Sequence, residues 1–366
     1  KLLTRAGVQV IIGRGRLVSP TAVEVVVEDG ETQRIEAAHI VVATGSSPVR
    51  LLIPGLDGPH VLDSTGALAL EALPPSILIM GGGVIGCEFA SLYRALGVEV
   101  IVVELLDRLL PLMEAALGEA MEWVFNAHGI VTHTGSKVTR VESAATGAVV
   151  TVETRKGEKK FEVAKVLSSV GRRPNVADIG LDEVGVEYDR SGIKVDRGMR
   201  TNIPGIYAIG DVVGGVMLAH LASRQGEVAV ENALGHDVRL DDRAVPSCIF
   251  TLPEAASVGM SEETARQKGY MVKIGQFPLN SNSKAVIQGE PDGFVKVVAE
   301  AKYGEVLGVH IFGPHASDLI LEPTFGITLE NTLAEFNAPI RPHPTLGEAV
   351  AEALLAVDGR APHLLR

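Results

Sequence analysis

His343 and Glu348, near the C-terminus, have side chains and a spacing that suit acid–base chemistry. A histidine changes charge near neutral pH, and a nearby carboxylate can orient its ring and stabilise its charged form. Pro342 and Pro344 flank the histidine and restrict its backbone. The stretch 345–348, TLGE, also matches a capping box, which starts a helix without any catalysis. Both interpretations stay open, because a carboxylate has two oxygens and can serve both purposes.

A glycine-rich turn, GGGVIG at 81–86, lies between a predicted strand at 76–80 and a predicted helix at 84–97. The first glycine allows a tight turn, the second lets a pyrophosphate approach the backbone, and the third lets helix and strand pack closely. The start of the helix offers N–H groups and partial positive charge to phosphates. The pattern predicts a dinucleotide site in a βαβ unit; the alternative is a glycine-rich helix start without a ligand.

Glu104 follows the second strand of this unit, 18 residues after Gly86, within reach of a ribose 2′-hydroxyl. A carboxylate there repels a 2′-phosphate, and Leu105 and Leu106 follow where an arginine could have bound one. These features favour NAD over NADP. The alternative is that Glu104 is a solvated strand end.

A second strand and turn, TNIPGIYAIGD at 201–211, ends in Gly210 and Asp211. The glycine allows close approach of a ligand, and the aspartate can accept hydrogen bonds from a polyol. Asp211 could equally cap a helix, and the spacing alone does not decide between the two roles. A helix is expected to follow and to end near Gly235.

Seven motifs occur in the order found in the flavoprotein disulfide reductases, and the chain most closely resembles the dihydrolipoamide dehydrogenase family. The motifs are TGS at 44–46, GGGVIGCE at 81–88, GRRPN at 171–175, TNIPGIYAIGD at 201–211, MLAH at 217–220, FTLPEAASVG at 250–259 and HPTLGE at 343–348. The resemblance implies an α/β fold with two Rossmann-like dinucleotide-binding domains, for FAD and NAD, and an α+β C-terminal dimerisation domain. It predicts the remainder of the FAD-binding domain at 1–70, the NAD-binding domain at 71–175, a central FAD-binding region at 176–245 and the interface domain at 246–366.

The same resemblance implies two sets of cofactor-binding residues. Those expected to hold NAD are Gly81, Gly82, Gly83, Val84, Ile85, Gly86, Glu88 and Glu104, with Val138 and Gly171 at the edge of the site. Those expected to line the FAD pocket are Gly15, Thr44, Gly45, Ser46, Asp211, Met217, Leu218, Ala219 and His220. The last four start a helix whose positive end could stabilise charge on the reduced flavin.

The implied activity is the oxidation of protein-bound dihydrolipoamide to lipoamide, through a redox disulfide and FAD, with NAD⁺ as the final acceptor. In the similar enzymes His343 would exchange a proton with the dithiol substrate, and Glu348 would orient and charge it. The enzyme would be a homodimer in which His343 reaches the disulfide of the second copy. Its macromolecular partner would be the lipoyl domain of a 2-oxoacid dehydrogenase or glycine-cleavage complex.

The disulfide itself is expected as a C-x₄-C pair, whereas Cys87 and Cys248 are the two cysteines of the sequence and are far apart. We expect both to be small buried residues, and the redox pair and a first FAD glycine motif to lie upstream of Lys1.

Few cysteines favour a reducing cytoplasm. The net charge of −12 argues against nucleic acid or an anionic membrane as partner, and no apolar run suits a membrane span or a signal peptide. No metal site stands out, and His310 and His315 are expected to be structural.

Two other functions remain open on sequence alone. The chain could be a truncated, non-catalytic NAD-binding module, or another flavoprotein disulfide reductase. Glu104 disfavours a glutathione reductase, the cysteine-free end GRAPHLLR disfavours a mercuric reductase, and His343 with Glu348 disfavours a flavin transhydrogenase.

One departure from the family is the stretch 322–340, where Pro323 and later Pro339 are expected to break a helix of the dimer interface.

Overall fold

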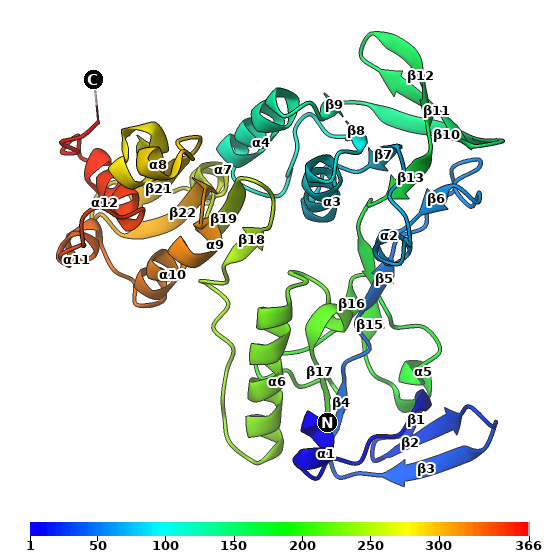
Figure 1. Cartoon of the computed structure of the whole chain (residues 1–366). Coiled ribbons are helices and arrows are strands. Elements are labelled where there is room, and N and C mark those ends of the chain that lie inside the picture. Colours follow the sequence, from blue (N-terminus) through cyan, green and yellow to red (C-terminus); the bar gives the residue numbers. More distant parts are fainter. Residues whose placement is uncertain (365–366) are drawn as a thin grey trace. The chain divides into compact units, whose positions relative to one another are not determined.

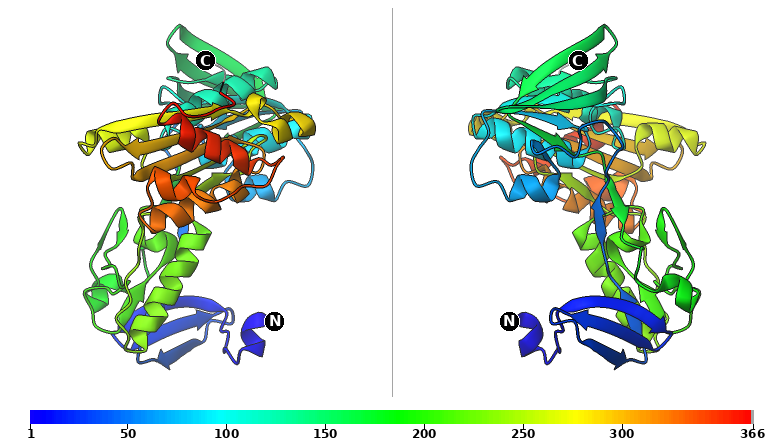
Figure 2. Two further views of the ribbon diagram at one scale, coloured as in Figure 1. Left: turned by 90° about the vertical axis from the view of Figure 1, so that its left-hand side faces the viewer. Right: turned by 90° about the vertical axis from the view of Figure 1, so that its right-hand side faces the viewer.

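The computed structural model describes residues 1–364, and the chain divides into two compact units (Figures 1 and 2). The first unit consists of Lys1–Ser47 and Arg172–Asp241. The second consists of Pro48–Gly171 together with the chain from Asp242 onward. Each unit is therefore assembled from two stretches that are distant in the sequence.

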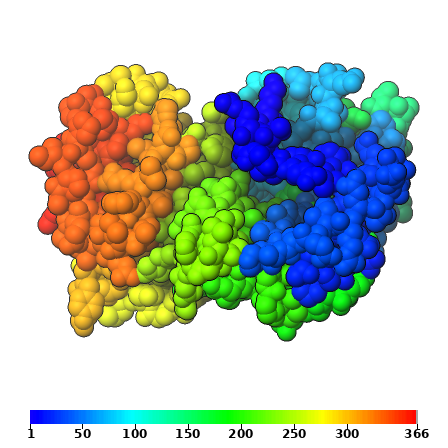
Figure 3. All heavy atoms as spheres, turned by 90° about the horizontal axis from the view of Figure 1, so that it is seen from below, coloured from blue at the N-terminus to red at the C-terminus, as the bar shows by residue number. Residues whose placement is uncertain are grey.

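The first unit begins with a short helix, α1 (Leu2–Arg5), and a three-stranded antiparallel sheet. The strands follow one another along the chain as β1 (Gly13–Ser19), β2 (Ala22–Val27) and β3 (Thr32–Glu36). The valines of β2 are β-branched and favour the extended backbone, and Gly30 adopts φ +84° in the turn that follows. This stretch is blue in Figure 3.

Two short strands form the parallel centre of this unit. β4 (Ile40–Val42) pairs with β17 (Ile206–Ala208), with Ile40 opposite Ile206. Because parallel strands end at the same edge of a sheet, the turn at 44–46 and the Gly210–Asp211 turn emerge side by side. The strands share one apolar core with side chains from elsewhere in the unit, including Leu17, Leu181, Val186, Ile193 and Val212.

After β17 the chain forms a 3-10 turn, η1 (Gly210–Val213), and then helix α6 (Ala219–Ala233). Gln225 is buried on this helix, and its Oε1 accepts a hydrogen bond from the Gly210 N–H at 2.7 Å, which fixes the helix against the turn. Gly235 follows the end of α6 with φ +93°, as predicted. The remaining elements of the unit are short: β14 (Arg172–Pro174), α5 (Leu181–Val184), β15 (Tyr188–Asp189) and β16 (Gly192–Ile193).

The second unit contains a parallel sheet with the strand order β6–β13–β7–β8–β9. Its strands are β6 (Val61–Leu62), β7 (Ser76–Met80), β8 (Glu99–Val103), β9 (Val131–His133) and β13 (Lys165–Ser168). Its helices are α2 (Ser64–Leu68), α3 (Val84–Ala95) and α4 (Ala115–Ala127). Strand β5 (Ser46–Pro48), earlier in the chain, pairs instead with β14. The predicted βαβ unit is confirmed, and α3 ends at Ala95 rather than at residue 97.

Strand β7 shows why this sheet needs a continuous apolar run. Ile77 and Ile79 pack with helices α3 and α4, whereas Leu78 and Met80 point the other way. There they meet a three-stranded antiparallel sheet formed by β10 (Lys137–Ala144), β11 (Gly147–Thr154) and β12 (Gly157–Val163). Successive side chains of a strand point to opposite faces, so both faces of β7 are buried.

The second unit also contains a five-stranded antiparallel sheet with the strand order β18–β19–β22–β21–β20. Its strands are β18 (Ser247–Ile249), β19 (Glu254–Gly259), β20 (Val272–Pro278), β21 (Phe294–Glu300) and β22 (Val306–Gly313). Helix α12 (Gly347–Ala356) packs against β20 and β21. A Cβ at Gly275 of β20 would lie 2.1 Å from the Ala353 carbonyl oxygen, so this close approach requires glycine.

Short helices connect these strands: α7 (Glu262–Gln267), η2 (Leu279–Ser281) and α8 (Ser283–Gln288). After β22 the chain forms α9 (Ala316–Leu319), α10 (Leu321–Thr328) and α11 (Leu333–Asn337) before it reaches α12. The sequence predicted a helix break at Pro323, and the structure shows that this position is wrong. Pro323 is the third residue of α10, where the N–H would have no partner within the helix, so the ring is tolerated. The helix is divided instead at Ile320, and α11 ends at Asn337, where the second break was expected.

A buried charged cluster joins three elements of the second unit. Lys296 of β21 is only 8% exposed, and its Nζ donates to Glu114 Oε1 and to Glu262 Oε2, each at 2.8 Å. Glu114 precedes α4, and its Oε2 accepts the Glu262 N–H at 2.9 Å. Burial raises the pKa of Glu114, but the hydrogen bonds from Lys296 and the Glu262 N–H outweigh this and leave the pKa below its usual value. The cluster therefore stays ionised.

We expect Lys296→Met to lower the free energy of unfolding by roughly 3–5 kcal/mol, because it leaves the buried Glu114 carboxylate without its cation. The matched control is Lys273→Met, which removes the exposed ion pair between Lys273 Nζ and Asp358 Oδ1 at 3.0 Å. An exposed pair contributes about 0–1 kcal/mol. Chemical denaturation of both variants measures the difference, and equal losses would contradict the assignment.

Candidate active site

The glycine turn has the geometry of a phosphate cradle. Gly81 adopts φ +107°, and a Cβ at Gly86 would lie 1.9 Å from the Gly81 carbonyl oxygen, so strand and helix approach as closely as the sequence predicts. A Cβ at Gly83, by contrast, would meet no atom within 4 Å. Gly83 is the N-cap of α3, and Val84 and Ile85 form its first turn. The N–H groups at this end lack partners within the helix, and this open cradle fits a dinucleotide.

Glu104 lies directly after β8 and braces this turn. Its Oε2 accepts the Gly82 N–H at 2.6 Å and its Oε1 accepts the Leu106 N–H at 2.7 Å. The side chain is buried, so the alternative of a solvated strand end is wrong. Each carboxylate oxygen keeps a second lone pair for a ribose hydroxyl, and this contact remains a prediction. The bracing role was missed by sequence reasoning, because spacing does not show which backbone amides lie beside Glu104.

The other three NAD candidates occupy different surroundings. Glu88 is half-buried on α3, and its Oε1 accepts the Phe250 N–H at 3.0 Å. Val138 is buried among the apolar side chains of β10–β12, and its backbone lies in the β10–β11 ladder opposite Val152. Gly171 has φ +112° and open space where a Cβ would be. Of the three, only Gly171 has the open surroundings that a cofactor edge requires.

The FAD candidates Ser46 and Asp211 are brought together, although they lie in different stretches of the chain. The Ser46 hydroxyl donates to Asp211 Oδ2, and Arg172 donates to Ser46 through Nε and Nη2, each bond being 2.7 Å long. Arg172 Nε also lies 3.8 Å from Asp211 Oδ2. Asp211 is the second residue of η1, whose N-cap is Ile209, so the helix-cap alternative is wrong.

Thr44 is held by a second contact from the same loop as Arg172. The Thr44 hydroxyl donates to the Asn175 carbonyl oxygen at 2.8 Å, and Asn175 Nδ2 donates to the Thr44 carbonyl oxygen at 2.9 Å. Between these anchors Gly45 adopts φ +70° with no atom within 4 Å of its Cβ position. Arg172 and Asn175 were missed as site residues, although the GRRPN motif that contains them was the available signal. The anchored, open turn fits a flavin nucleotide.

Gly15 and the stretch 217–220 lie at other places in the first unit. Gly15 is paired with Val25 inside the β1–β2 hairpin. Met217 and Leu218 precede α6, of which Leu218 is the N-cap, and Ala219 and His220 form its first turn. The predicted helix start is confirmed, and its N–H groups supply the expected partial positive charge.

His343 and Glu348 are in contact, as predicted. The His343 Nδ1 lies 3.0 Å from Glu348 Oε1 and 3.2 Å from Oε2, while Oε2 also accepts the Thr345 N–H at 2.8 Å. The Thr345 hydroxyl donates to the Pro342 carbonyl oxygen at 2.9 Å instead of capping α12, so only the glutamate half of the capping box forms. One carboxylate therefore serves both the helix start and the imidazole.

The electrostatics of this pair follow from the position of Glu348. Burial raises the pKa of the Glu348 carboxyl, but the Thr345 N–H, His343 and His363 together leave it below its usual value. An ionised Glu348 accepts the proton on Nδ1, which leaves Nε2 of His343 as the basic nitrogen. The His343 side chain is 71% exposed, so Nε2 is accessible.

The loop that carries His343 is anchored on both sides. Arg341 pairs with Glu322 at the start of α10, and its Nη2 donates to the Phe336 carbonyl oxygen at 3.0 Å. Asn282 Nδ2 donates to the Thr345 carbonyl oxygen at 3.0 Å. These contacts hold the backbone before and after the histidine, which is what a side chain that must transfer a proton requires.

Neither cysteine suits redox chemistry. Cys87 is fully buried on α3, and its Sγ donates to the Gly82 carbonyl oxygen at 3.3 Å. Burial raises the pKa of Cys87 far above its usual value and also raises that of Cys248. Both thiols are free, and because a thiolate is the reactive form, the raised pKa values disfavour redox chemistry at both. This confirms the expectation for Cys87; Cys248 is only half-buried.

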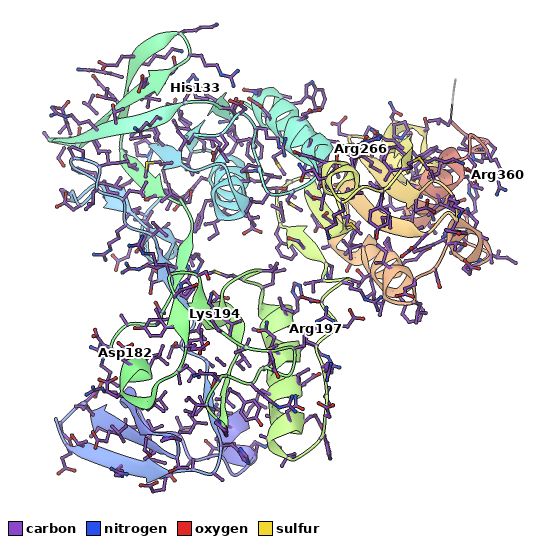
Figure 4. All side chains as sticks on the ribbon, turned by 180° about the vertical axis from the view of Figure 1, so that it is seen from behind. His133, Asp182, Lys194, Arg197, Arg266 and Arg360 are labelled. Carbon is purple, nitrogen blue, oxygen red and sulfur yellow. The ribbon has the colours of Figure 1, made fainter. Side chains whose placement is uncertain are left out.

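No cluster of three potential metal ligands occurs within residues 1–364. His310 is fully buried and bonded to Ser257 Oγ at 2.6 Å, and burial lowers its pKa to about 4, so it is a neutral core residue. His315 lies exposed before α9, 3.5 Å from Asp318. His133 of β9, labelled in Figure 4, packs against Phe161 with ring centroids 5.2 Å apart. These histidines are explained by their packing and pairing.

Two family patterns match the chain. Pyridine nucleotide-disulphide oxidoreductase matches residues 1–226, and the dimerisation domain of the same family matches residues 245–354. The chain therefore belongs to the pyridine nucleotide-disulphide oxidoreductase family. This confirms the predicted fold class and the class of enzyme, an oxidoreductase that uses FAD and NAD, and it supports a homodimer.

Particular relatives extend the match over nearly the whole chain. A dihydrolipoyl dehydrogenase of Bacillus subtilis is 41% identical over 99% of this chain and 79% of its own length. The dihydrolipoyl dehydrogenase of Chlamydia muridarum is 45% identical over 96% of this chain and 75% of its own length. The crystal structure of LpdA from Mycobacterium tuberculosis superposes with a TM-score of 0.88 at 33% identity, covering 96% of this chain and 78% of that one.

The two glycines of the cradle provide a matched pair of variants. Gly86→Ala should destabilise the protein by about 1–3 kcal/mol, because its Cβ would collide with the Gly81 carbonyl. The added methyl group in Gly83→Ala would meet no protein atom, so stability should be nearly unchanged. The methyl group should clash with bound ligand, however, and weaken NADH binding by about tenfold or more. Thermal unfolding and NADH titration separate the two effects. Unchanged NADH affinity in Gly83→Ala would exclude the start of α3 from the cofactor site.

Proposed function

We propose that the protein is a dihydrolipoyl dehydrogenase, which oxidises protein-bound dihydrolipoamide to lipoamide with NAD⁺ as the final electron acceptor. The relatives named dihydrolipoyl dehydrogenase support this at 41% and 45% identity over nearly the whole chain. The observation that carries the proposal is the His343–Glu348 pair, with Nδ1 bound to the carboxylate and the ring exposed.

In the proposed reaction Nε2 of His343 takes the proton from one substrate thiol. The thiolate that forms attacks one sulfur of the redox disulfide, which breaks the S–S bond, gives a mixed disulfide and releases the other enzyme sulfur as a thiolate. The second substrate sulfur then displaces the enzyme sulfur from the mixed disulfide, so the substrate dithiol becomes a disulfide and the enzyme disulfide becomes a dithiol. Glu348 stabilises the positive charge that the imidazole gains. The two cysteines of this disulfide would be residues other than Cys87, which is buried, and Cys248, whose thiol pKa is raised by partial burial.

The chain's own residues would hold the two cofactors in separate places. Bound FAD and NAD supply the two-electron transfer that amino-acid side chains do not perform. The N–H groups at the start of α3 would bind the NAD pyrophosphate, and Glu104 its ribose. Asp211 would accept hydrogen bonds from the flavin nucleotide, with Arg172 and Ser46 orienting the carboxylate. The remaining NAD and FAD candidates keep the roles that the family resemblance implies.

The wider assembly follows from the same proposal. We place the FAD-binding domain at 1–70, the NAD-binding domain at 71–175, the central region at 176–245 and the interface domain from 246 onward. His343 would act across the interface on the disulfide of a second copy. The substrate carrier would be the lipoyl domain of a 2-oxoacid dehydrogenase or glycine-cleavage complex, in the cytoplasm. In the part of the chain that the structure describes, no helix is long and apolar enough to span a membrane.

His343→Gln should lower kcat for dihydrolipoamide oxidation by about 10²–10⁴-fold, because the amide cannot take the thiol proton. The reduction of an artificial acceptor by NADH, which needs no substrate thiol, should stay near the wild-type rate. His236→Gln is the matched control, since His236 is also exposed and paired with a glutamate, Glu231. Wild-type turnover of dihydrolipoamide in the His343 variant would refute the proposed role.

A further inference from the structure

A second histidine–glutamate pair uses a carboxylate on the same helix, α12, as the first pair. His363, in the C-terminal tail, places its Nδ1 2.8 Å from Glu352 Oε1, and its backbone N–H donates to Glu352 Oε2 at 3.3 Å. Glu352 is 8% exposed on α12, whereas the His363 ring is exposed. Leu364, the next residue, packs against the apolar core that contains Ala349, Val350 and Ala353 of the same helix. The tail is therefore fixed on α12 (Figure 1).

The two pairs are neighbours on one helical face. Glu348 and Glu352 are four residues apart on α12, a spacing that places side chains one above the other. Two negative charges at this spacing repel each other. His343 contacts the first carboxylate and His363 the second, so each carboxylate has its own imidazole.

His363 also acts on Glu348 itself. Its positive charge is among the causes that lower the pKa of the Glu348 carboxyl, and Glu348 in turn is among those that raise the pKa of His363, after Glu352. The charged groups on the neighbouring elements have other partners. Lys273 of β20 pairs with Asp358, Glu335 of α11 binds Thr332, and Arg341 pairs with Glu322.

We propose that His363 is a positioning residue for the proton transfer by His343. It holds the Glu352 carboxylate and sets a second cation beside Glu348, so that Glu348 remains ionised and keeps the His343 imidazole in place. His363 does not touch the substrate in this role and acts through the two glutamates. This inference rests on the proposed function for its catalytic consequence, while the electrostatic link between His363 and Glu348 is independent of it.

The effect of His363 on Glu348 has a definite sign. Protonated His363 favours the charged carboxylate, so its removal raises the pKa of Glu348. Glu348 then takes up a proton at a higher pH, and the His343 ring loses its charged acceptor earlier on acidification. In His363→Gln the part of the acidic limb of the kcat/KM profile where Glu348 itself takes up a proton, below about pH 5, should move to higher pH by a few tenths of a unit. The rate above this limb should change little.

Two further variants distinguish this role from a simple structural one. His363→Arg keeps a positive charge at all working pH values and should restore the acidic limb toward its wild-type position. Arg360→Gln, at the residue labelled in Figure 4, removes one positive charge from the same tail and should leave the limb unchanged. An equal shift in the Arg360 variant would show a general charge effect and would overturn the assignment.

A measurement without turnover separates this inference from the proposed function. The titration of Glu348 can be followed by carbon NMR of the flavin-loaded protein labelled at glutamate Cδ, with Glu348→Gln to assign its signal. We expect the midpoint to move to higher pH in His363→Gln and to return in His363→Arg. An unchanged Glu348 titration would overturn the inference whether or not dihydrolipoamide is a substrate. A shifted titration without dihydrolipoamide turnover would instead refute the proposed function alone.

Discussion

The proposed chemistry depends on the contact between the ionised carboxylate of Glu348 and the imidazole of His343. One of its oxygens accepts the Thr345 N–H at the start of α12, and the other lies against Nδ1 of His343. The same group therefore sets where the helix begins and which nitrogen of the imidazole is free. Since the helix packs on β20 and β21, the position of the base is tied to the sheet beneath it.

Glu104 and Glu114 are used in the same way in the nucleotide-binding part of the second unit. Glu104 binds the Gly82 N–H in the glycine turn after β7 and the Leu106 N–H just after its own strand, and Glu114 binds a backbone N–H together with Lys296. A buried carboxylate that accepts hydrogen bonds from backbone N–H groups fixes the backbone that donates them. This gives rigid turns at places where glycine alone would leave the chain free to move.

Local pattern predicted the regular elements of the site well. The apolar run at 76–80, the three glycines and the helix from residue 84 were placed correctly, because strand and helix periods and glycine turns are properties of neighbouring residues. The stretch around Pro323 shows where such reasoning fails. Proline was expected to break the helix, yet it lies in the first turn of α10, where its missing N–H costs nothing.

The sequence by itself determined the βαβ unit, the histidine–glutamate spacing and the family. Tertiary structure alone decided which distant side chains meet: Arg172 on Ser46 and Asp211, Lys296 on Glu114 across 182 positions of sequence, and His363 on Glu352. Such contacts depend on how whole elements pack, and each charged side chain has many possible partners in the unfolded chain. The physical reason is that the packing of whole elements, and not spacing along the chain, brings these charged groups within bonding distance.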